Sequence, residues 1–334
     1  MEISRRTFLA GAAVAAAEVA WPSLGDPLIL GTGSHRYSCH HDWLTAPTGH
    51  AFGDTHGVAQ DKAGRIYIAH TVHPDSASKN AVCVYTADGQ FVESWGSEFA
   101  GGAHGLDLRS EGGTEYLYHC DTDRRVVVKT DLKGKVIWER GAPAESGKYP
   151  NGEGYVPTNV AFGPNGDVYV ADGYGSSYIH IYSKDGDYKK TFAGAGTEPG
   201  KTRSPHGIWL DDRGSDPQIV VADRSNRRLQ YFDLDGKHVK FVTKGMRLPC
   251  HFSIQNGDML IPDLESIVTI VDEKNQVVAA LGDGAPSGLR GHPRTEFRDG
   301  KFIHPHSAKF LHNGDILVVE WVPIGRVTLL KKLK

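Results

Sequence analysis

The sequence predicts an all-β, six-bladed β-propeller that occupies residues 21–334 as one domain. Six similar segments recur at intervals of 45 to 55 residues, a length that fits one four-stranded blade. Each segment contains short apolar runs separated by glycine-containing turns, and none has the 3.6-residue period of a helix. Five segments begin at a histidine, and the remaining one carries asparagine there: His56, His104, Asn159, His206, His251 and His306.

Composition excludes several classes of partner. The chain has 334 residues, of which 39% are hydrophobic, so it can bury the core of one large domain. Its net charge is −3, and its only basic run is the C-terminal segment 331–334. We therefore expect no nucleic-acid partner and no membrane span in the mature chain, and we expect a monomer.

Residues 1–20 have the features of a twin-arginine signal segment. Arg5 and Arg6 lie between Ser4 and the Thr7-Phe8-Leu9 run, and an apolar stretch of small residues follows, too short to span a bilayer. The segment predicts export to a bacterial periplasm or the extracellular space; the alternative is an ordinary N-terminal helix. This route generally carries folded proteins, so a metal could be loaded before export.

The elements follow in the same order within each repeat. A short apolar strand begins at the histidine, and a turn such as Asn165-Gly166 or Asn313-Gly314 leads into an alternating second strand. Third and fourth strands are joined by turns such as Asp185-Gly186. The sixth repeat stops after its third strand, at 327–333, so we expect an N-terminal strand at 27–33 to close the ring and cover the open edge.

Turn lengths indicate which face is functional. First-to-second turns are short and lie on the face away from the histidines, whereas the loops on the histidine face are long, at 70–79, 141–155, 194–203 and 283–302. Long loops on a rigid scaffold are where binding and catalysis concentrate. The second strands end beside the histidines, at His70, Asp121, Asp172, Asp223, Asp263 and Glu320.

Most of these acidic residues are expected to accept hydrogen bonds from backbone groups of the adjacent loops. Tyr174 and Arg224, just beyond two of the second strands, are candidate functional residues; the alternative for them is ordinary loop packing.

Four cysteines are widely spaced, and either a disulfide or burial as small apolar side chains fits them: Cys39, Cys83, Cys120 and Cys250.

The three histidines from blades two, four and six are related by threefold symmetry. His104, His206 and His306 should therefore converge on the axis and leave one side open, as in a catalytic zinc site. Such a metal polarises oxygen and acidifies a bound hydroxyl. Tyr174 has an ordinary pKa of about 10, so it could act as a base only if the metal and Arg224 favoured its phenolate.

Four stretches carry a resemblance to a known family: 155–161 (YVPTNVA), 168–174 (VYVADGY), 204–207 (SPHG) and 221–230 (VADRSNRRLQ). They resemble peptidyl-α-hydroxyglycine α-amidating lyase, among the NHL-repeat propellers, most strongly over residues 100–240 and at Pro305-His306. The resemblance implies that His104, His206 and His306 bind zinc, that Tyr174 is the base and that Arg224 orients the substrate. It also implies a central structural calcium.

The chain departs from that family at three places. No arginine stands at 70–73, where the family has a second active-site arginine, and Ser307 replaces an acidic calcium ligand. The sequence therefore gives no support for calcium or for a peptide substrate. His56 and His251 are additional histidines. Either they extend the metal site, which then suits zinc, copper or nickel, or they and Asn159 are polar neighbours of the ligands.

Three functions fit these observations. The first is an exported, zinc-dependent lyase-like enzyme, or a hydrolase, whose site lies in the central channel on the long-loop face. Cleavage of a carbinolamide C–N bond in a small molecule or modified peptide is its most concrete form. The second is a non-catalytic propeller that binds protein or glycan and holds a structural metal. The third is redox chemistry at a histidine-bound copper.

Overall fold

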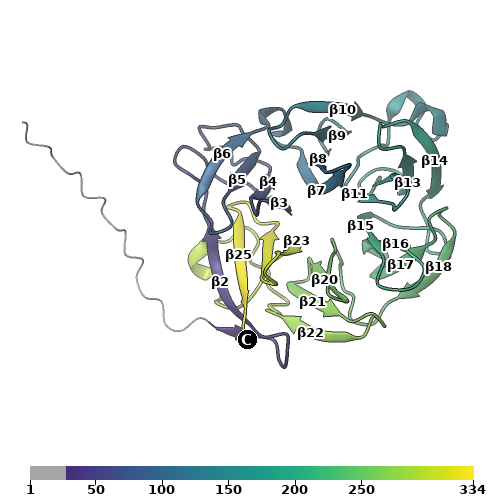
Figure 1. Ribbon diagram of the computed structural model, residues 1–334. Coiled ribbons are helices and arrows are strands. Elements are labelled where there is room, and N and C mark those ends of the chain that lie inside the picture. The colour runs from purple at the N-terminus through teal and green to yellow at the C-terminus, as the bar shows by residue number, and fades with distance from the viewer. Residues whose placement is uncertain (1–27) are drawn as a thin grey trace, which may run out of the picture.

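The computed structural model describes residues 28–334, which form six antiparallel sheets arranged around a central axis (Figure 1). The expected signal segment, residues 1–20, lies outside the described residues. Within residues 28–334 the helical elements are five short 3-10 helices, at Ser97–Phe99, Ala144–Ser146, Pro150–Gly152, Arg224–Asn226 and Arg294–Glu296. In this part of the chain no helix is long and apolar enough to cross a membrane. The all-β, six-bladed propeller is therefore confirmed.

Five blades are built from four consecutive strands each, with the first strand nearest the axis and the fourth at the rim (Figure 1). Blade one is β3 (Thr55–Gln60), β4 (Ile66–His70), β5 (Val82–Tyr85) and β6 (Phe91–Trp95). Blade two is β7 (Ala103–Glu111), β8 (Thr114–Asp121), β9 (Val126–Thr130) and β10 (Val136–Arg140). Blade three is β11 (Asn159–Phe162), β12 (Val168–Ala171), β13 (Tyr178–Tyr182) and β14 (Tyr188–Ala193). Blade four is β15 (Pro205–Asp211), β16 (Gln218–Asp223), β17 (Arg228–Phe232) and β18 (His238–Val242). Blade five is β19 (Ser253–Gln255), β20 (Asp258–Asp263), β21 (Ile267–Val271) and β22 (Val277–Leu281).

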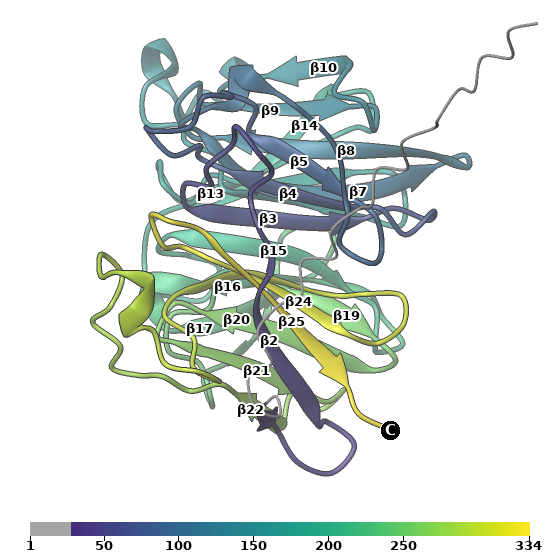
Figure 2. The ribbon, with the colours of Figure 1, turned by 90° about the vertical axis from the view of Figure 1, so that its left-hand side faces the viewer.

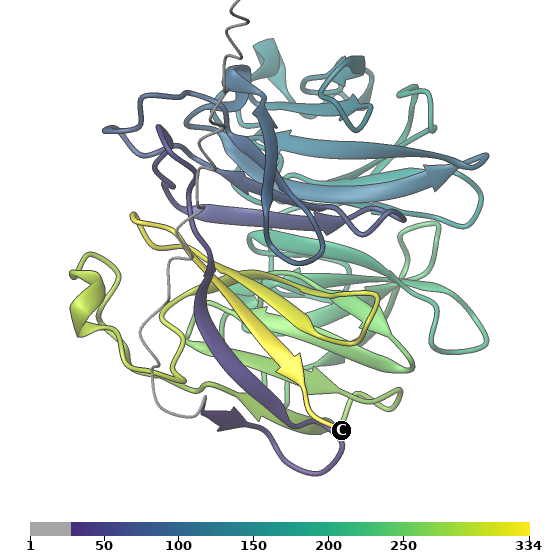
Figure 3. The same ribbon diagram turned by 60° about the vertical axis from the view of Figure 1, so that its left-hand side comes forward.

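Blade six contains strands from both ends of the chain. Its inner strands are β23 (Pro305–Phe310), β24 (Ile316–Glu320) and β25 (Arg326–Lys332), and β2 (Tyr37–Leu44) pairs antiparallel with β25 (Figures 2 and 3). The expected position of the outer strand, 27–33, was wrong. From Leu28 onward that segment supplies only β1 (Ile29–Leu30), which pairs with the outer side of β2.

Alternating apolar residues pack between neighbouring blades. One cluster joins Val58 and Ile68 of blade one to Leu317 and Val319 of blade six, and all four are at most 2% exposed. In five of the six blades the turn between the first and second strands places glycine at positive φ, for example 94° at Gly166, a conformation that side chains with a Cβ rarely adopt. All four cysteines are buried and free, so the burial alternative holds for them.

The two faces of the ring differ as expected. In the side view, the loop before β23 projects from the face on which the second strands end, opposite the short hairpin turns (Figure 2). The acidic residues at those strand ends accept backbone hydrogen bonds. Asp172 accepts from Val156 at 2.7 Å and Asp223 from Arg203 at 2.7 Å. Their predicted structural role is confirmed.

Candidate metal centre

A local irregularity in the sheet directs four histidines toward the axis. In blades one, two, four and six the residue before the histidine pairs with the end of the second strand, and the pairing is then interrupted at the histidine. In blade three the pairing runs regularly from Asn159 onward. A β-bulge re-aims a side chain. The bulges occur at the four histidines that meet in the centre: His56, His104, His206 and His306.

Three of these imidazoles form a nearly equilateral group. The ring centroids of His104, His206 and His306 are separated by 4.8, 4.7 and 4.7 Å, and each ring lies edge-on to the others. The three side chains are buried, at 3%, 0% and 3% exposure. The Nε2 atoms of His104 and His206 are 3.2 Å apart. The structure thus brings together the three residues predicted to bind metal.

Each of these rings is held by a backbone carbonyl of the next blade. The Nδ1 atom of His104 is 2.8 Å from the Thr158 oxygen, and that of His206 is 2.9 Å from the Cys250 oxygen. His306 Nδ1 is 3.0 Å from the His56 oxygen. A carbonyl oxygen only accepts, so each Nδ1 carries the proton and donates it. The Nε2 atom of each neutral ring therefore presents a lone pair to the centre.

Burial keeps these rings neutral. It lowers the pKa of His104 to about 3, although the Thr158 carbonyl acts in the opposite direction, and it lowers the pKa values of His206 and His306 well below the ordinary value. Nearby, the Tyr174 hydroxyl lies 3.1 Å from His104 Nε2 and 3.0 Å from His206 Nε2. One hydroxyl proton cannot satisfy two acceptors. Neutral imidazole nitrogens that converge in this way fit a zinc-like cation.

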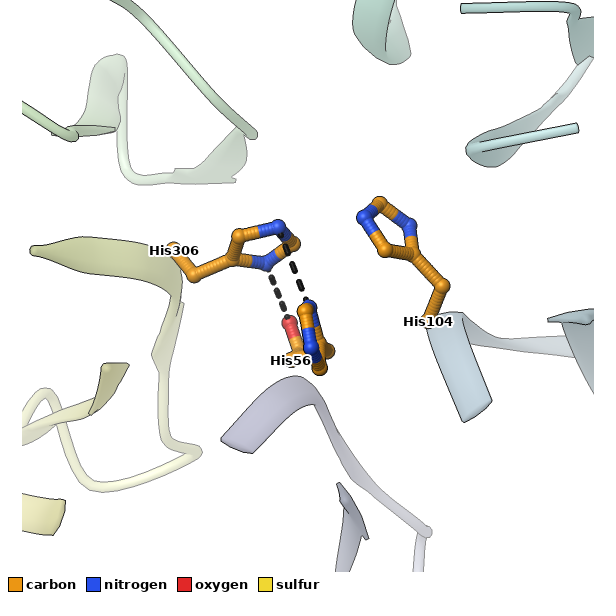
Figure 4. A group of neighbouring side chains, drawn as sticks. All are labelled: His56, His104 and His306. Atoms are coloured by element: carbon orange, nitrogen blue, oxygen red, sulfur yellow. Dashed lines mark hydrogen bonds between the residues drawn. The ribbon is translucent and has the colours of Figure 1, made fainter. Parts of the chain in front are cut away.

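His56 is a fourth member of the cluster. Its Nδ1 lies 3.2 Å from His306 Nε2, while its carbonyl accepts from His306 Nδ1 (Figure 4). The potential ligand atoms of His56, His104 and His306 all lie within 4.8 Å of one another. These three residues can therefore hold an ion, and His206 adjoins them through its Nε2 atom, 3.2 Å from His104 Nε2. Both alternatives left open by the sequence for His56 are compatible with this geometry.

Tyr174 and Arg224 lie together at the open side of the cluster. Tyr174 is 43% exposed, so its side chain reaches the surface while its hydroxyl lies close to His104 and His206. The Arg224 guanidinium carbon is 5.2 Å from the centroid of the Tyr174 ring, and its Nη1 is 3.5 Å from the hydroxyl. Burial of the hydroxyl raises the pKa of Tyr174, and the charge of Arg224 opposes that rise. A second positive charge would favour the phenolate further.

The other two predicted neighbours lie outside the cluster's hydrogen bonds. His251 directs Nδ1 to the Phe252 carbonyl at 2.8 Å and Nε2 to Asp107 at 3.0 Å, so neither nitrogen is left for a metal. The side-chain oxygen of Asn159 accepts from the backbone of Val160. The rings of His104 and His206 are instead oriented by the backbone carbonyls of Thr158 and Cys250, which immediately precede Asn159 and His251. The sequence did not reveal the role of these carbonyls.

Comparison with known proteins supports the resemblance. No protein-family model matches the chain. It is 28% identical over 191 residues to NHL repeat-containing protein 3 of Homo sapiens, covering 55% of this chain and 53% of that protein. It is 26% identical over 189 residues to a probable peptidyl-alpha-hydroxyglycine alpha-amidating lyase of Caenorhabditis elegans, covering 53% and 52%. The chain spans about half the length of the curated relatives it matches.

A solved structure confirms the fold over nearly the whole chain. A streptogramin B lyase superimposes with a TM-score of 0.60 at 13% identity, covering 88% of this chain and 98% of that one. At this identity the match concerns the fold alone. Together, the sequence relatives and the propeller fold show that the chain resembles NHL-repeat propellers and the amidating lyase.

Proposed function

We propose that this protein is a zinc-dependent, lyase-like enzyme that cleaves the C–N bond of a carbinolamide in the central channel. The observation that carries the proposal is a set of three buried, neutral imidazoles with neighbouring rings, two of which place Nε2 within 3.1 Å of the Tyr174 hydroxyl. The lyase named among its relatives supports this reaction class. Zinc bound by His104, His206 and His306, with His56 as a further candidate ligand, would supply a Lewis acid that polarises oxygen.

The protein's own residues then account for the proton movements. Arg224 holds an anionic group of the substrate at the channel mouth and, by its charge, favours the phenolate of Tyr174. Tyr174 takes the proton from the carbinol hydroxyl. The hydroxyl carbon becomes a carbonyl as its bond to nitrogen breaks, and the departing amide nitrogen takes a proton from Tyr174. The products are a carbonyl compound and a primary amide, and Tyr174 returns to its starting state.

Elemental analysis tests the metal. The purified protein should contain about one equivalent of transition metal, and His206→Ala should lose it. His238→Ala is the matched control, because His238 lies in the same blade on the rim strand β18 and should keep the metal. A folded wild type without transition metal would contradict the proposal.

Turnover of an N-acyl-α-hydroxyglycine tests the reaction. Tyr174→Phe should abolish release of the amide while metal content is unchanged, whereas Tyr178→Phe, in the same blade, should retain activity. A metal-containing protein that turns over no carbinolamide would favour the alternative, a non-catalytic propeller that binds protein or glycan.

We also propose that residues 1–20 direct export through the twin-arginine route to the periplasm or the cell exterior. Arg5→Lys with Arg6→Lys should then leave the protein in the cytoplasm of a bacterial host, as cell fractionation would detect. A small-molecule or modified-peptide substrate and a monomeric state belong to the same proposal. Unchanged export of the double variant would contradict this targeting.

Ring closure by the N-terminal segment is part of the proposal, because β2 completes the sheet that carries His306. Blade one, which packs beside blade six, carries His56. We therefore expect the geometry of the central cluster to depend on the packing between blades one and six.

A further inference from the structure

An apolar groove of about 390 Å³ lies between blades five and six on the histidine face. Its walls come from three sources: the loop before β19, the ends of β20 and β24, and the long loop 283–302. The apolar lining is Leu248, Leu264, Ala285, Pro286 and Trp321, and the polar lining includes His304 and Glu265. Ligand sites characteristically combine apolar walls with a few polar groups at this volume.

Two short chain segments connect the lining of the groove to the candidate metal centre. His304 precedes His306 by two residues, and the Trp321 amide donates to the His304 carbonyl at 2.8 Å. On the other wall, Leu248 precedes by two residues the Cys250 carbonyl that holds His206. A molecule whose reacting carbon lies at the Tyr174 hydroxyl could therefore extend into the groove.

Ion pairs fix the long loop that forms the outer wall. Asp283 pairs with Arg247 through both carboxylate oxygens, at 2.8 and 2.6 Å. Arg290 pairs with Asp54 at 2.8 Å, and Arg294 pairs with Asp42. Arg290 also stacks on the Trp321 ring, with its guanidinium carbon 3.7 Å from the ring centroid. These contacts hold the indole in place, so the groove is preformed rather than made on binding.

Charge around the groove is uneven. Glu265, the acidic residue in its lining, is neutralised by Arg227 at 2.8 and 3.0 Å. Arg224, at the channel mouth, has no carboxylate partner among residues 28–334. The site therefore offers an apolar groove on one side and an unpaired cation beside Tyr174.

We propose that the groove binds an apolar N-acyl group of a substrate whose carboxylate is held by Arg224. This proposal rests on the proposed function, since it places the carbinol carbon at Tyr174 between these two ends. Large apolar acyl groups are selected because they bury surface against Trp321 and Leu264.

Binding of N-acylglycines tests the groove without turnover, because these compounds lack the hydroxyl group that reacts. Calorimetry on the full protein should give N-octanoylglycine an affinity at least about tenfold higher than that of N-acetylglycine. Trp321→Ala should remove that difference. Leu264→Gln, which keeps the side-chain size, should reduce it and serves if the tryptophan variant does not fold. His292→Ala, on the exposed part of the same loop, is the control and should retain it.

Equal affinities in the wild type, absence of binding, or a chain-length preference that persists in both groove variants would overturn the groove proposal. The proposed function fails separately. If the chain-length preference depends on Trp321 but N-octanoyl-α-hydroxyglycine is not cleaved, the groove stands and the lyase does not. If cleavage occurs with no preference for acyl length, the lyase stands and the groove does not.

Discussion

Glycine follows three of the four clustered histidines, at Gly57, Gly105 and Gly207. A Cβ at Gly207 would lie 2.3 Å from the Cys250 oxygen, and one at Gly105 would lie 2.4 Å from the Thr158 oxygen. These are the two carbonyls that accept from His206 and His104. The absence of a side chain after the histidine therefore lets the next blade approach and fix the ring.

Gly207→Ala should displace the Cys250 carbonyl and weaken metal binding, because the partner of His206 Nδ1 would move. Loss of an outer hydrogen bond to a metal-ligating histidine typically lowers affinity by roughly ten- to a hundredfold. Competition with a chelator measures this. Gly214→Ala, in the same blade, has open space around the added Cβ and should bind metal as the wild type does. Equal affinities for the two variants would contradict the role assigned to Gly207.

At this scale the sequence predicts part of the site. Repetition of histidine at one position of the repeat indicates that the side chains share an environment, and the structure brings His104, His206 and His306 together. The sequence could not distinguish His56 from His251, because both occupy that position. Their different surroundings depend on the bulge in blade one and on Asp107, which reaches His251 from another blade. The residue after the histidine was the available signal that distinguishes them, because Gly57 follows His56 whereas Phe252 follows His251.

Among the elements, β2 joins the beginning of the chain to its last strand. Tyr37, Cys39 and Leu44 are at most 8% exposed, while the residues between Cys39 and Leu44 are polar or aromatic and partly exposed. A rim strand covered on one face only has a weak apolar pattern. The more apolar segment at 27–33 was therefore expected at the rim, and from Leu28 onward it forms only the short β1.

Removal of residues 1–44 should destabilise the propeller strongly, because it opens the edge of β25 and uncovers the core beneath Tyr37. Removal of residues 1–35 retains β2 and should have a much smaller effect. Thermal unfolding and light scattering measure stability and aggregation for both. A 1–44 deletion that unfolds at the wild-type temperature as a monomer would refute ring closure by β2.

In the molecule as a whole, a second layer of charged groups lies beside the histidine cluster. It includes Asp107 and Lys309, each three residues beyond a clustered histidine on an inner strand. Asp107, from the blade opposite that of His251, pairs with it at 3.0 Å, and both side chains are at most 5% exposed. Lys309 lies 4.6 Å from the Trp209 ring centroid, and burial lowers its pKa while Asp107 acts in the opposite direction. Blades two, four, five and six thus meet in one layer, and the pair connects opposite sides of the ring.

His251→Ala should lower the free energy of unfolding by about 3–5 kcal/mol, because it leaves the buried Asp107 carboxylate without its hydrogen-bonding partner. Metal content should be unchanged, since both nitrogens of His251 are engaged elsewhere. Urea unfolding and elemental analysis check the two expectations. Combining His251→Ala with Asp107→Ala should recover part of the loss. Loss of metal in His251→Ala would instead identify His251 as a ligand.

Acid should also destabilise the propeller. Burial lowers the pKa of His119 and His180 to about 3 and that of His41 to about 2, whereas in the unfolded chain each has a pKa of about 6.5. Between these values the unfolded state binds more protons. Stability is therefore intact above about pH 6.5 and falls as the pH decreases toward 3, by up to about 1.4 kcal/mol per pH unit for each histidine. Urea unfolding at pH 7, 6 and 5 with a chelator present measures it, and a constant stability would contradict the assignment.

The antiparallel pairing of β2 with β25 also determines when the molecule can be finished during biosynthesis. β2 leaves the ribosome long before β25, so the sixth sheet can form only after residues 326–332 have emerged. His306, near the end of the chain, arrives just before that moment. A ribosome-stalled nascent chain that ends before His306 would lack one corner of the central triad, so the three imidazoles can meet only once synthesis has reached blade six.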